Sequence, residues 1–196
     1  MSAMLAALLA GLTAGLIHVL SGPDHLAAVA PLTGGRRVAA WRAGFLWGLG
    51  HSTGVLAVGL LALWLRSALP LEALSSWSER LVGVVLIGVG LWGFRRVLQG
   101  PIESHVHVHA ACAVGVLHGI AGSSHFLGVL PALALPSTAA SLGYLGGFGT
   151  GTVVAMSGFA FGVGLIGSER APQHRRWLLS ASSAIAIVVG AVWLRG

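Results

Sequence analysis

The chain has 196 residues, of which 56% are hydrophobic and 8% are charged, and its mean hydropathy is +0.88. Soluble domains carry about 25% charged residues, so this composition excludes an ordinary soluble fold. The net charge is +6, but the arginines stand in short clusters between apolar runs and form no basic face, which excludes nucleic acid as a partner.

Six stretches are long and apolar enough to cross a membrane once short polar breaks are allowed. A hydrocarbon core of about 30 Å requires roughly 20 mainly apolar residues in a helix. The sequence therefore predicts an all-α integral membrane protein, with a single membrane domain over residues 1–196. In chain order the expected spans are Ala3–Leu20, Ala39–Leu65, Leu81–Leu98, Ala110–Ala134, Thr138–Ile166 and Trp177–Leu194.

The first of these spans could be mistaken for a secretory signal. It lacks the basic region that precedes the apolar part of such signals, and it continues directly into a polar motif, so we expect a retained helix. The single cysteine, Cys112, lies inside an apolar run. It excludes an intramolecular disulfide framework and a cysteine-based zinc motif, and we expect it to pack between helices.

Small residues predict where helices approach each other closely. Gly143, Gly147 and Gly151 recur at four-residue spacing, and Gly48 and Gly50 flank a single residue. Membrane helices associate through such residues because their backbones can come near each other. We expect helix packing at both places.

The arginines are distributed unequally between the expected loops. By the positive-inside rule the side with more arginines faces the cytoplasm, so the first, third and fifth loops are expected there and both termini outside, in a bacterial-type cytoplasmic membrane. The richer side has Arg36, Arg37, Arg42, Arg95, Arg96, Arg170, Arg175 and Arg176, and the other side has Arg66, Arg80 and Arg195.

The chain also contains an internal duplication. Residues 15–31 match residues 115–131 without a gap, and residues 43–55 match residues 142–154. The first match pairs Gly15, His18, Gly22, His25, Val29 and Pro31 with Gly115, His118, Gly122, His125, Val129 and Pro131; the second pairs Gly44, Gly48, Gly50 and Thr53 with Gly143, Gly147, Gly149 and Thr152. Glycine identities alone would mean little here, but two histidines and a proline in one register indicate a true repeat.

The duplication gives each half three spans, and an odd number makes the second half enter the membrane from the opposite side. We therefore expect two inverted three-helix repeats, about 1–98 and about 110–196, joined by a cytoplasmic, histidine-containing loop over 99–109. Transporters built in this way hold their substrate near the midplane, where interrupted helices of the two halves meet. We expect the first helix of each repeat to be interrupted.

Ionisable residues at membrane depth usually face a site or pathway. Those predicted here are His18, Asp24, His25, His51, His118 and His125. On an unbroken helix, residues seven apart share a face but lie about 10.5 Å apart along the axis, too far for one ion to bind both. Gly22 and Pro23 provide a break between the first two histidines, and residues 122–124 form a softer counterpart.

Imidazoles with one carboxylate suit nickel, cobalt, zinc or copper, whereas magnesium and calcium favour oxygen ligands. His51 is followed by Ser52 and Thr53, which could orient its ring, and Thr150 replaces it in the second half. Each histidine could instead serve as a hydrogen bond between helices. The run at His105, His107 and His109 could hand over metal or form an incidental polar loop.

At HVLSGPDH (18–25), FLWGLGHSTGV (45–55) and LHGIAGSS (117–124) the chain resembles the nickel/cobalt transporter superfamily, in particular its small six-helix members associated with urease and hydrogenase maturation. The resemblance implies metal binding by His18, Asp24 and His25, and by His51. High-affinity nickel permeases of the family space the two histidines six apart with a further acid between them. Here the spacing is seven and Ser21-Gly22 replace that acid, as the hydrogenase-accessory branch tolerates.

The predicted function is secondary transport of Ni²⁺ or Co²⁺, with the metal as substrate, no prosthetic group and no enzymatic activity. Histidine titrates near neutral pH, so coupling of metal transport to proton movement through the site is one alternative. The expected partners are the metal ion and the lipid bilayer. A second copy of the chain and a metal chaperone are further partners that the sequence neither requires nor excludes. A membrane metalloenzyme is the main alternative, although the predicted spans hold no HExxH pattern and no second acid. Transport of a non-metal solute with the histidines as a proton relay is another.

Overall fold

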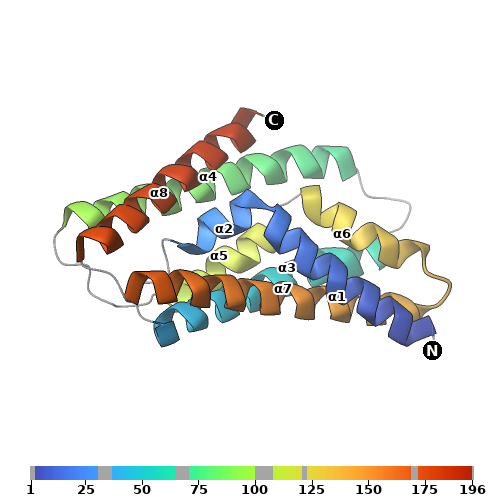
Figure 1. Ribbon diagram of the computed structural model, residues 1–196. Coiled ribbons are helices and arrows are strands. Elements are labelled where there is room, and N and C mark those ends of the chain that lie inside the picture. The colour runs from blue at the N-terminus through green and yellow to red at the C-terminus, as the bar shows by residue number, and fades with distance from the viewer. Residues whose placement is uncertain are drawn as a thin grey trace.

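The computed structural model describes residues 3–30, 37–64, 71–99, 108–120, 123–168 and 172–195, and within these ranges the chain is helical and contains no strand. Figure 1 shows the elements as an elongated bundle. They are α1 (Ala3–Ser21), α2 (Pro23–Val29), α3 (Arg37–Trp64), α4 (Leu71–Leu98), α5 (Val108–Ile120), α6 (Ser123–Ala134), α7 (Thr138–Ser168) and α8 (Pro172–Arg195).

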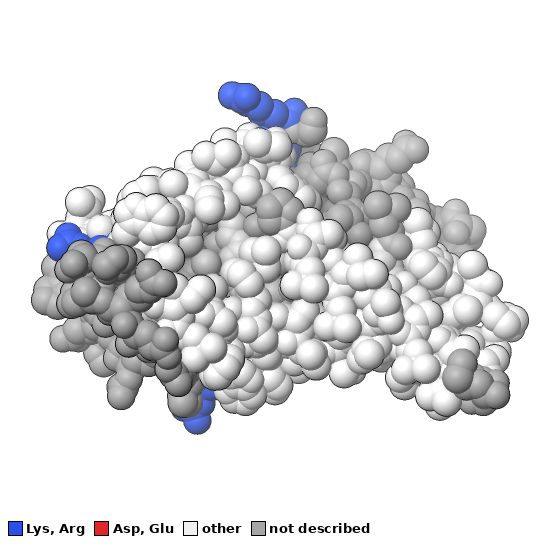
Figure 2. Space-filling view, viewed as in Figure 1, with Lys and Arg blue, Asp and Glu red and all other residues white. Residues whose placement is uncertain are grey.

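Among the described residues, five helices are long and apolar enough to cross a membrane: α1, α3, α4, α7 and α8. They correspond to five of the six expected spans. The fourth expected span, Ala110–Ala134, is divided into α5 and α6, of 13 and 12 residues, neither of which reaches the length of a span alone. On the face shown in Figure 2, the central part of the described surface is uncharged and the arginines lie at the margins of the view, which suits a surface in contact with lipid.

Two helices begin earlier than their apolar residues indicate. The apolar part of α4 was expected from Leu81 and that of α8 from Trp177, whereas the helices begin at Leu71 and Pro172. Hydropathy locates only the part of a helix that lies in hydrocarbon, and a helix can continue through polar residues beyond it. The extra turns of α4 contain Glu72 and Glu79, which lie between two expected spans.

Close helix pairs join the first part of the chain to the second. A Cβ atom added at Gly147 or Gly151 on α7 would meet the backbone of Leu8 or Leu12 on α1, so these helices touch backbone to backbone. Likewise, Gly50 on α3 lies against the carbonyl of Cys112 on α5. In both pairs the contacts advance in the same chain direction, so the helices are parallel. The expected packing at Gly147, Gly151 and Gly50 is thus confirmed.

Two further pairs are antiparallel. Gly44 on α3 contacts Met156 on α7, while Gly149 further along α7 lies near Ser52. On the other side of the bundle, Gly83 on α4 contacts Gly190 on α8 and Gly90 lies near Ser183. It follows that α1 and α5 run in opposite directions, as do α3 and α7, and α4 and α8. Figure 1 shows the N-terminus at the right-hand end of the bundle, the C-terminus above its middle, and α2 between the α4/α8 pair and the remaining helices.

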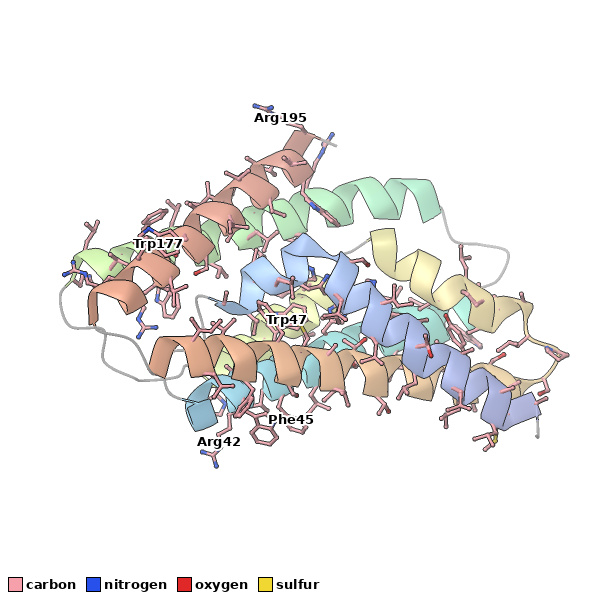
Figure 3. The ribbon with its side chains drawn as sticks, in the orientation of Figure 1. Arg42, Phe45, Trp47, Trp177 and Arg195 are labelled. Atoms are coloured by element: carbon pink, nitrogen blue, oxygen red, sulfur yellow. The ribbon has the colours of Figure 1, made fainter. Side chains whose placement is uncertain are left out.

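The apolar interior consists of two clusters. One surrounds Trp47 and includes residues of α1, α2, α3, α4, α5 and α7; the other surrounds Phe148 and includes residues of α1, α3, α6 and α7. Trp47 and Phe148 are the largest fully buried or nearly fully buried side chains. Figure 3 shows Trp47 inside the bundle, whereas Arg42 and Arg195 point outward from different helices. The ionisable side chains of the interior lie between these two clusters.

Candidate metal centre

A break in the first helix creates the centre. Helix α1 ends at Ser21, Gly22 adopts an extended conformation with φ −92° and ψ 100°, and α2 begins at Pro23. The amide of Gly22 donates to the carbonyl of Val19 at 3.3 Å, which closes the last turn of α1. The break expected at Gly22-Pro23 is therefore confirmed. It turns the chain so that the ring centroids of His18 and His25 lie 4.5 Å apart.

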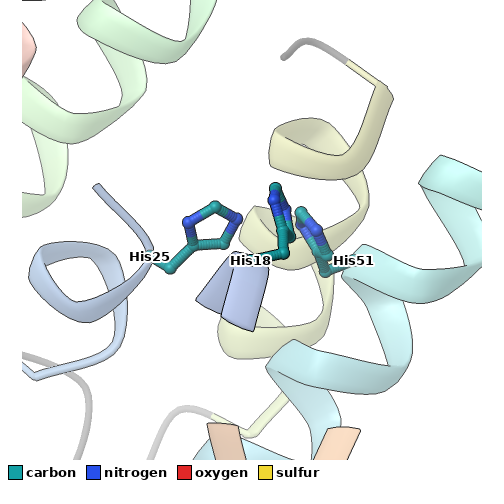
Figure 4. A group of neighbouring side chains, drawn as sticks. All are labelled: His18, His25 and His51. Atoms are coloured by element: carbon teal, nitrogen blue, oxygen red, sulfur yellow. The ribbon is translucent and has the colours of Figure 1, made fainter. Parts of the chain in front are cut away.

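Four imidazoles from four helices meet at this break. His18 comes from α1, His25 from α2, His51 from α3 and His118 from α5. The ring centroid of His25 lies 5.0 Å from that of His51 and 4.9 Å from that of His118. His25 is thus the central ring, with the other three around it. Figure 4 shows His18 and His51 nearly parallel, with His25 turned across them.

One carboxylate connects two of these rings. Oδ1 of Asp24 lies 3.1 Å from Nδ1 of His25, and Oδ2 lies 2.9 Å from Nε2 of His118. Asp24 is 3% exposed, and both imidazoles are 1% exposed. A buried carboxylate is costly unless it is hydrogen-bonded or coordinates a metal, and Asp24 is satisfied on both oxygens. It fixes the orientation of both rings.

Aromatic side chains enclose the centre. The indole of Trp47 stacks on His51 with 4.9 Å between centroids and 9° between planes, and it lies 5.4 Å from His118. On another side Phe148 lies 5.3 Å from His18. Apolar rings thus pack directly against His18, His51 and His118.

Glycine is required at the break for space. A Cβ atom added at Gly22 would meet Nδ1 of His25 and Oδ1 of Asp24. Its φ of −92° is open to any residue, so the requirement comes from the neighbouring side chains and not from the backbone. The hydrogen-bonded arrangement of Asp24 and His25 thus depends on a residue without a side chain at position 22.

The arrangement has the donor set of a transition-metal site. One ligand atom each of His18, His25 and His51 lie within 4.8 Å of one another, and so do those of Asp24, His25 and His118. Imidazole nitrogens with a single carboxylate suit divalent nickel, cobalt, zinc or copper. The described residues thus form a potential metal-binding cluster.

The structure brings together five of the six residues predicted for the site. His125 belongs to α6, but its side chain lies outside the described residues. His109 is exposed at the start of α5, away from the buried cluster, and His105 and His107 lie outside the described residues. Thr150, the counterpart of His51, is exposed and donates to the carbonyl of Gly146. Thr150 therefore contributes no ligand to the described centre in place of His51.

The hydroxyls of Ser52 and Thr53 were expected to orient the ring of His51, but they donate elsewhere. Ser52 donates to the carbonyl of Gly149 on α7 at 3.0 Å, and Thr53 donates to the carbonyl of Leu49. Their protons therefore go to backbone carbonyls and not to the imidazole. Sequence reasoning also missed Trp47, although its place one helical turn before His51 puts both on one face of α3 and could have revealed the contact.

The chain is similar to two plant proteins. It is 38% identical to chloroplast protein FOR GROWTH AND FERTILITY 2 and 36% identical to chloroplast protein FOR GROWTH AND FERTILITY 1, both of Arabidopsis thaliana, over 92% of this chain in each case. The matches cover 54% and 56% of those proteins, so the chain spans about half the length of these curated relatives.

A bacterial protein is a more distant relative. The urease accessory protein UreH of Bacillus sp. (strain TB-90) is 27% identical over 83% of this chain and 78% of its own length. None of the three names is that of an enzyme. No protein-family model matches the chain, and no solved structure gives a significant match. The similarity to UreH thus partly supports the resemblance to the nickel/cobalt transporter superfamily.

Proposed function

We propose that this membrane protein is a secondary transporter that moves a divalent transition metal, nickel or cobalt, through the centre formed by His18, Asp24, His25, His51 and His118. The observation that carries the proposal is the meeting of four imidazoles and one carboxylate at a helix break inside an apolar bundle. Ionisable groups at such depth are costly and usually mark a substrate pathway. The similarity to a urease accessory protein agrees with a role in handling nickel.

The proposed architecture is a six-span inverted repeat in which α1 with α2, and α5 with α6, are the interrupted first helices. Two observations support it. The sequence duplication pairs α1 with α5 and α3 with α7, and the glycine contacts make the members of each pair run in opposite directions. His118, from the second half, meets Asp24, from the first. Ligands from both halves at one place are what alternating access through a central site requires.

The proposed orientation has both termini outside and residues 99–109 in the cytoplasm. The arginine distribution supports it, and α4 ends with Arg95 and Arg96 at the end of the bundle opposite the N-terminus. The proposed location is a bacterial-type cytoplasmic membrane. The Arabidopsis relatives are named as chloroplast proteins, so a chloroplast membrane is the alternative location that an experiment must distinguish.

The decisive experiment is uptake of radioactive nickel and cobalt into proteoliposomes. Wild-type protein is expected to carry at least one of the two metals, and His25→Ala is expected to reduce the flux by at least about tenfold, since it removes the central ligand. Ser21→Ala is the matched control, because its exposed hydroxyl donates only to backbone carbonyls of α1, those of Ile17 and His18. Equal flux in wild type and His25→Ala would exclude this centre as the transport site.

The same preparation separates the alternatives. Metal that is retained tightly after purification, together with turnover of a lipid or peptide, would indicate a metalloenzyme. Absence of histidine-dependent binding of any divalent metal by the purified protein would indicate a transporter for another solute.

A further inference from the structure

We propose that the centre contains two overlapping metal positions that share His25, and that the ion passes from one position to the other during transport. The inference rests on the proposed transport function and adds the path of the ion within the site.

The first position is formed by three imidazoles, those of His18, His25 and His51. Nδ1 of His25 is held by Asp24, so we assign Nε2 of His25 to this position. Figure 4 shows one nitrogen of the His25 ring turned toward the other two rings. A histidine that binds metal through one nitrogen and donates from the other to a carboxylate is a recurrent arrangement in metal sites, since the carboxylate orients the ring and makes it more basic. Asp24 is placed for this role.

The second position is formed by Asp24, His25 and His118. A metal here would replace the hydrogen bonds that Asp24 now makes to the two imidazoles at 3.1 and 2.9 Å. The carboxylate becomes a direct ligand and supplies one negative charge, whereas the first position offers three neutral rings. The two positions thus differ in both donor type and charge.

The two positions exclude each other because they share a ring. A neutral imidazole has one nitrogen with a free lone pair for a metal, while the other nitrogen has the proton. An ion that moves from Nε2 to Nδ1 of His25 therefore requires the proton of this ring to move from Nδ1 to Nε2. For Nε2 of His118 to bind the ion, the proton that it donates to Asp24 must likewise move to its Nδ1. The charge of each ring stays the same. Two divalent ions a few ångströms apart would also repel each other strongly. A single ion is thus expected to occupy one position at a time.

Both positions are enclosed by protein. His51, in the first position, is 0% exposed, and Asp24, His25 and His118, in the second, are between 1% and 3% exposed. His25, the ring common to both, transfers the ion between them.

The test uses Co²⁺ on the purified protein, with metal content, X-ray absorption and flux in proteoliposomes measured for each variant. His51→Ala removes the first position and His118→Ala removes the second. Their controls are the exposed neighbours Thr53→Ala and Leu117→Ala. Should either alanine variant not yield folded protein, His51→Asn or His118→Asn takes its place.

The two-position proposal expects one Co²⁺ per chain in wild type and in both variants. His51→Ala should show two coordinated imidazoles and His118→Ala three, each with flux reduced at least tenfold, while the controls stay within twofold of wild type. Two bound ions in wild type, loss of all binding in either variant, or wild-type flux in either variant would overturn it.

The proposed function fails in a different way. Wild type that binds Co²⁺ in this pattern but moves neither nickel nor cobalt would leave the two positions standing and exclude transport of these metals. Wild type that transports metal while His51→Ala or His118→Ala transports equally well would leave transport standing and exclude the transfer through His25.

Discussion

Asp24 and His118 are 94 residues apart in the chain, yet Oδ2 of the carboxylate lies 2.9 Å from Nε2 of the imidazole. The contact joins a short helix of the first half to a helix of the second. Because the same carboxylate also holds His25, the orientation of two candidate ligands depends on a single side chain.

Asp24→Asn is therefore expected to weaken metal binding by roughly 10- to 100-fold, the usual effect of removing a group that orients metal ligands. The amide keeps the size of the carboxylate but loses its charge and one of its two acceptor oxygens. Isothermal titration of the purified protein with Ni²⁺ and Co²⁺ measures the change. Ser21→Ala is the control, and an unchanged affinity in Asp24→Asn would show that the carboxylate does not support the site.

Gly22→Ala is expected to reduce metal binding by at least about tenfold, because its Cβ would occupy the space of His25 Nδ1 and Asp24 Oδ1. Gly88→Ala is a closely matched control, since nothing lies within 4 Å of a Cβ atom at that position on α4. The same titration compares the two variants. If both bind metal as wild type does, the ring and carboxylate can move aside at no cost, and the packing described at the break is not required.

Gly119→Ala is expected to destabilise the fold by about 1 to 3 kcal/mol, the usual cost of forcing additional atoms into a packed interior. Its Cβ would meet the backbone of His51, which holds α5 against α3. Thermal unfolding in detergent measures the loss. Gly146→Ala on α7 should unfold at the wild-type temperature because its surroundings are open, and a similar loss in both variants would argue against backbone contact as the cause.

Trp47→Ala is expected to cost about 3 to 5 kcal/mol, the range for truncating a buried aromatic residue, and to abolish metal flux by releasing His51. Trp47→Phe retains a ring that can stack on His51 and should preserve most of the flux. Trp41→Ala, exposed near the start of α3, serves as control. Measuring both flux and unfolding temperature separates a loss of stability from a loss of His51 positioning. Wild-type flux in Trp47→Ala would mean that His51 needs no contact with the indole.

The proposed orientation can be tested by labelling single cysteines, because Cys112 is the only native one. In a Cys112→Ser background, Arg195→Cys should react with a membrane-impermeant maleimide in intact cells. His109→Cys should react only after the membrane is opened. The reverse pattern would place the termini in the cytoplasm.

Much of the centre follows from residues that are near each other in sequence. His18 and His25 share a helical face, and Gly22-Pro23 must interrupt that helix, so their approach could be predicted from the spacing and the geometry of a helix alone. The glycines that allow close packing were also recognisable, since a missing side chain has the same effect wherever two helices cross.

Other features depend on contacts between distant parts of the chain. Nothing local to Asp24 indicates that His118 will be its partner, because the duplication aligns His118 with His18 and says nothing of which side chains meet. The hydroxyls of Ser52 and Thr53 were assigned to His51 by proximity in sequence, but backbone carbonyls compete for their protons. Hydropathy did not predict the early starts of α4 and α8, because their first turns are polar.

The grouping of the helices affects how the centre could respond to motion. Glycine contacts hold α1, α3, α5 and α7 together, and α4 and α8 form a separate antiparallel pair. Each of these two groups takes helices from both halves of the sequence, so the close helix contacts do not follow the division into duplicated halves. Helix α2, of seven residues, packs against α8 and α4 and contains Asp24 and His25. A displacement of the α4/α8 pair would therefore move these two side chains directly.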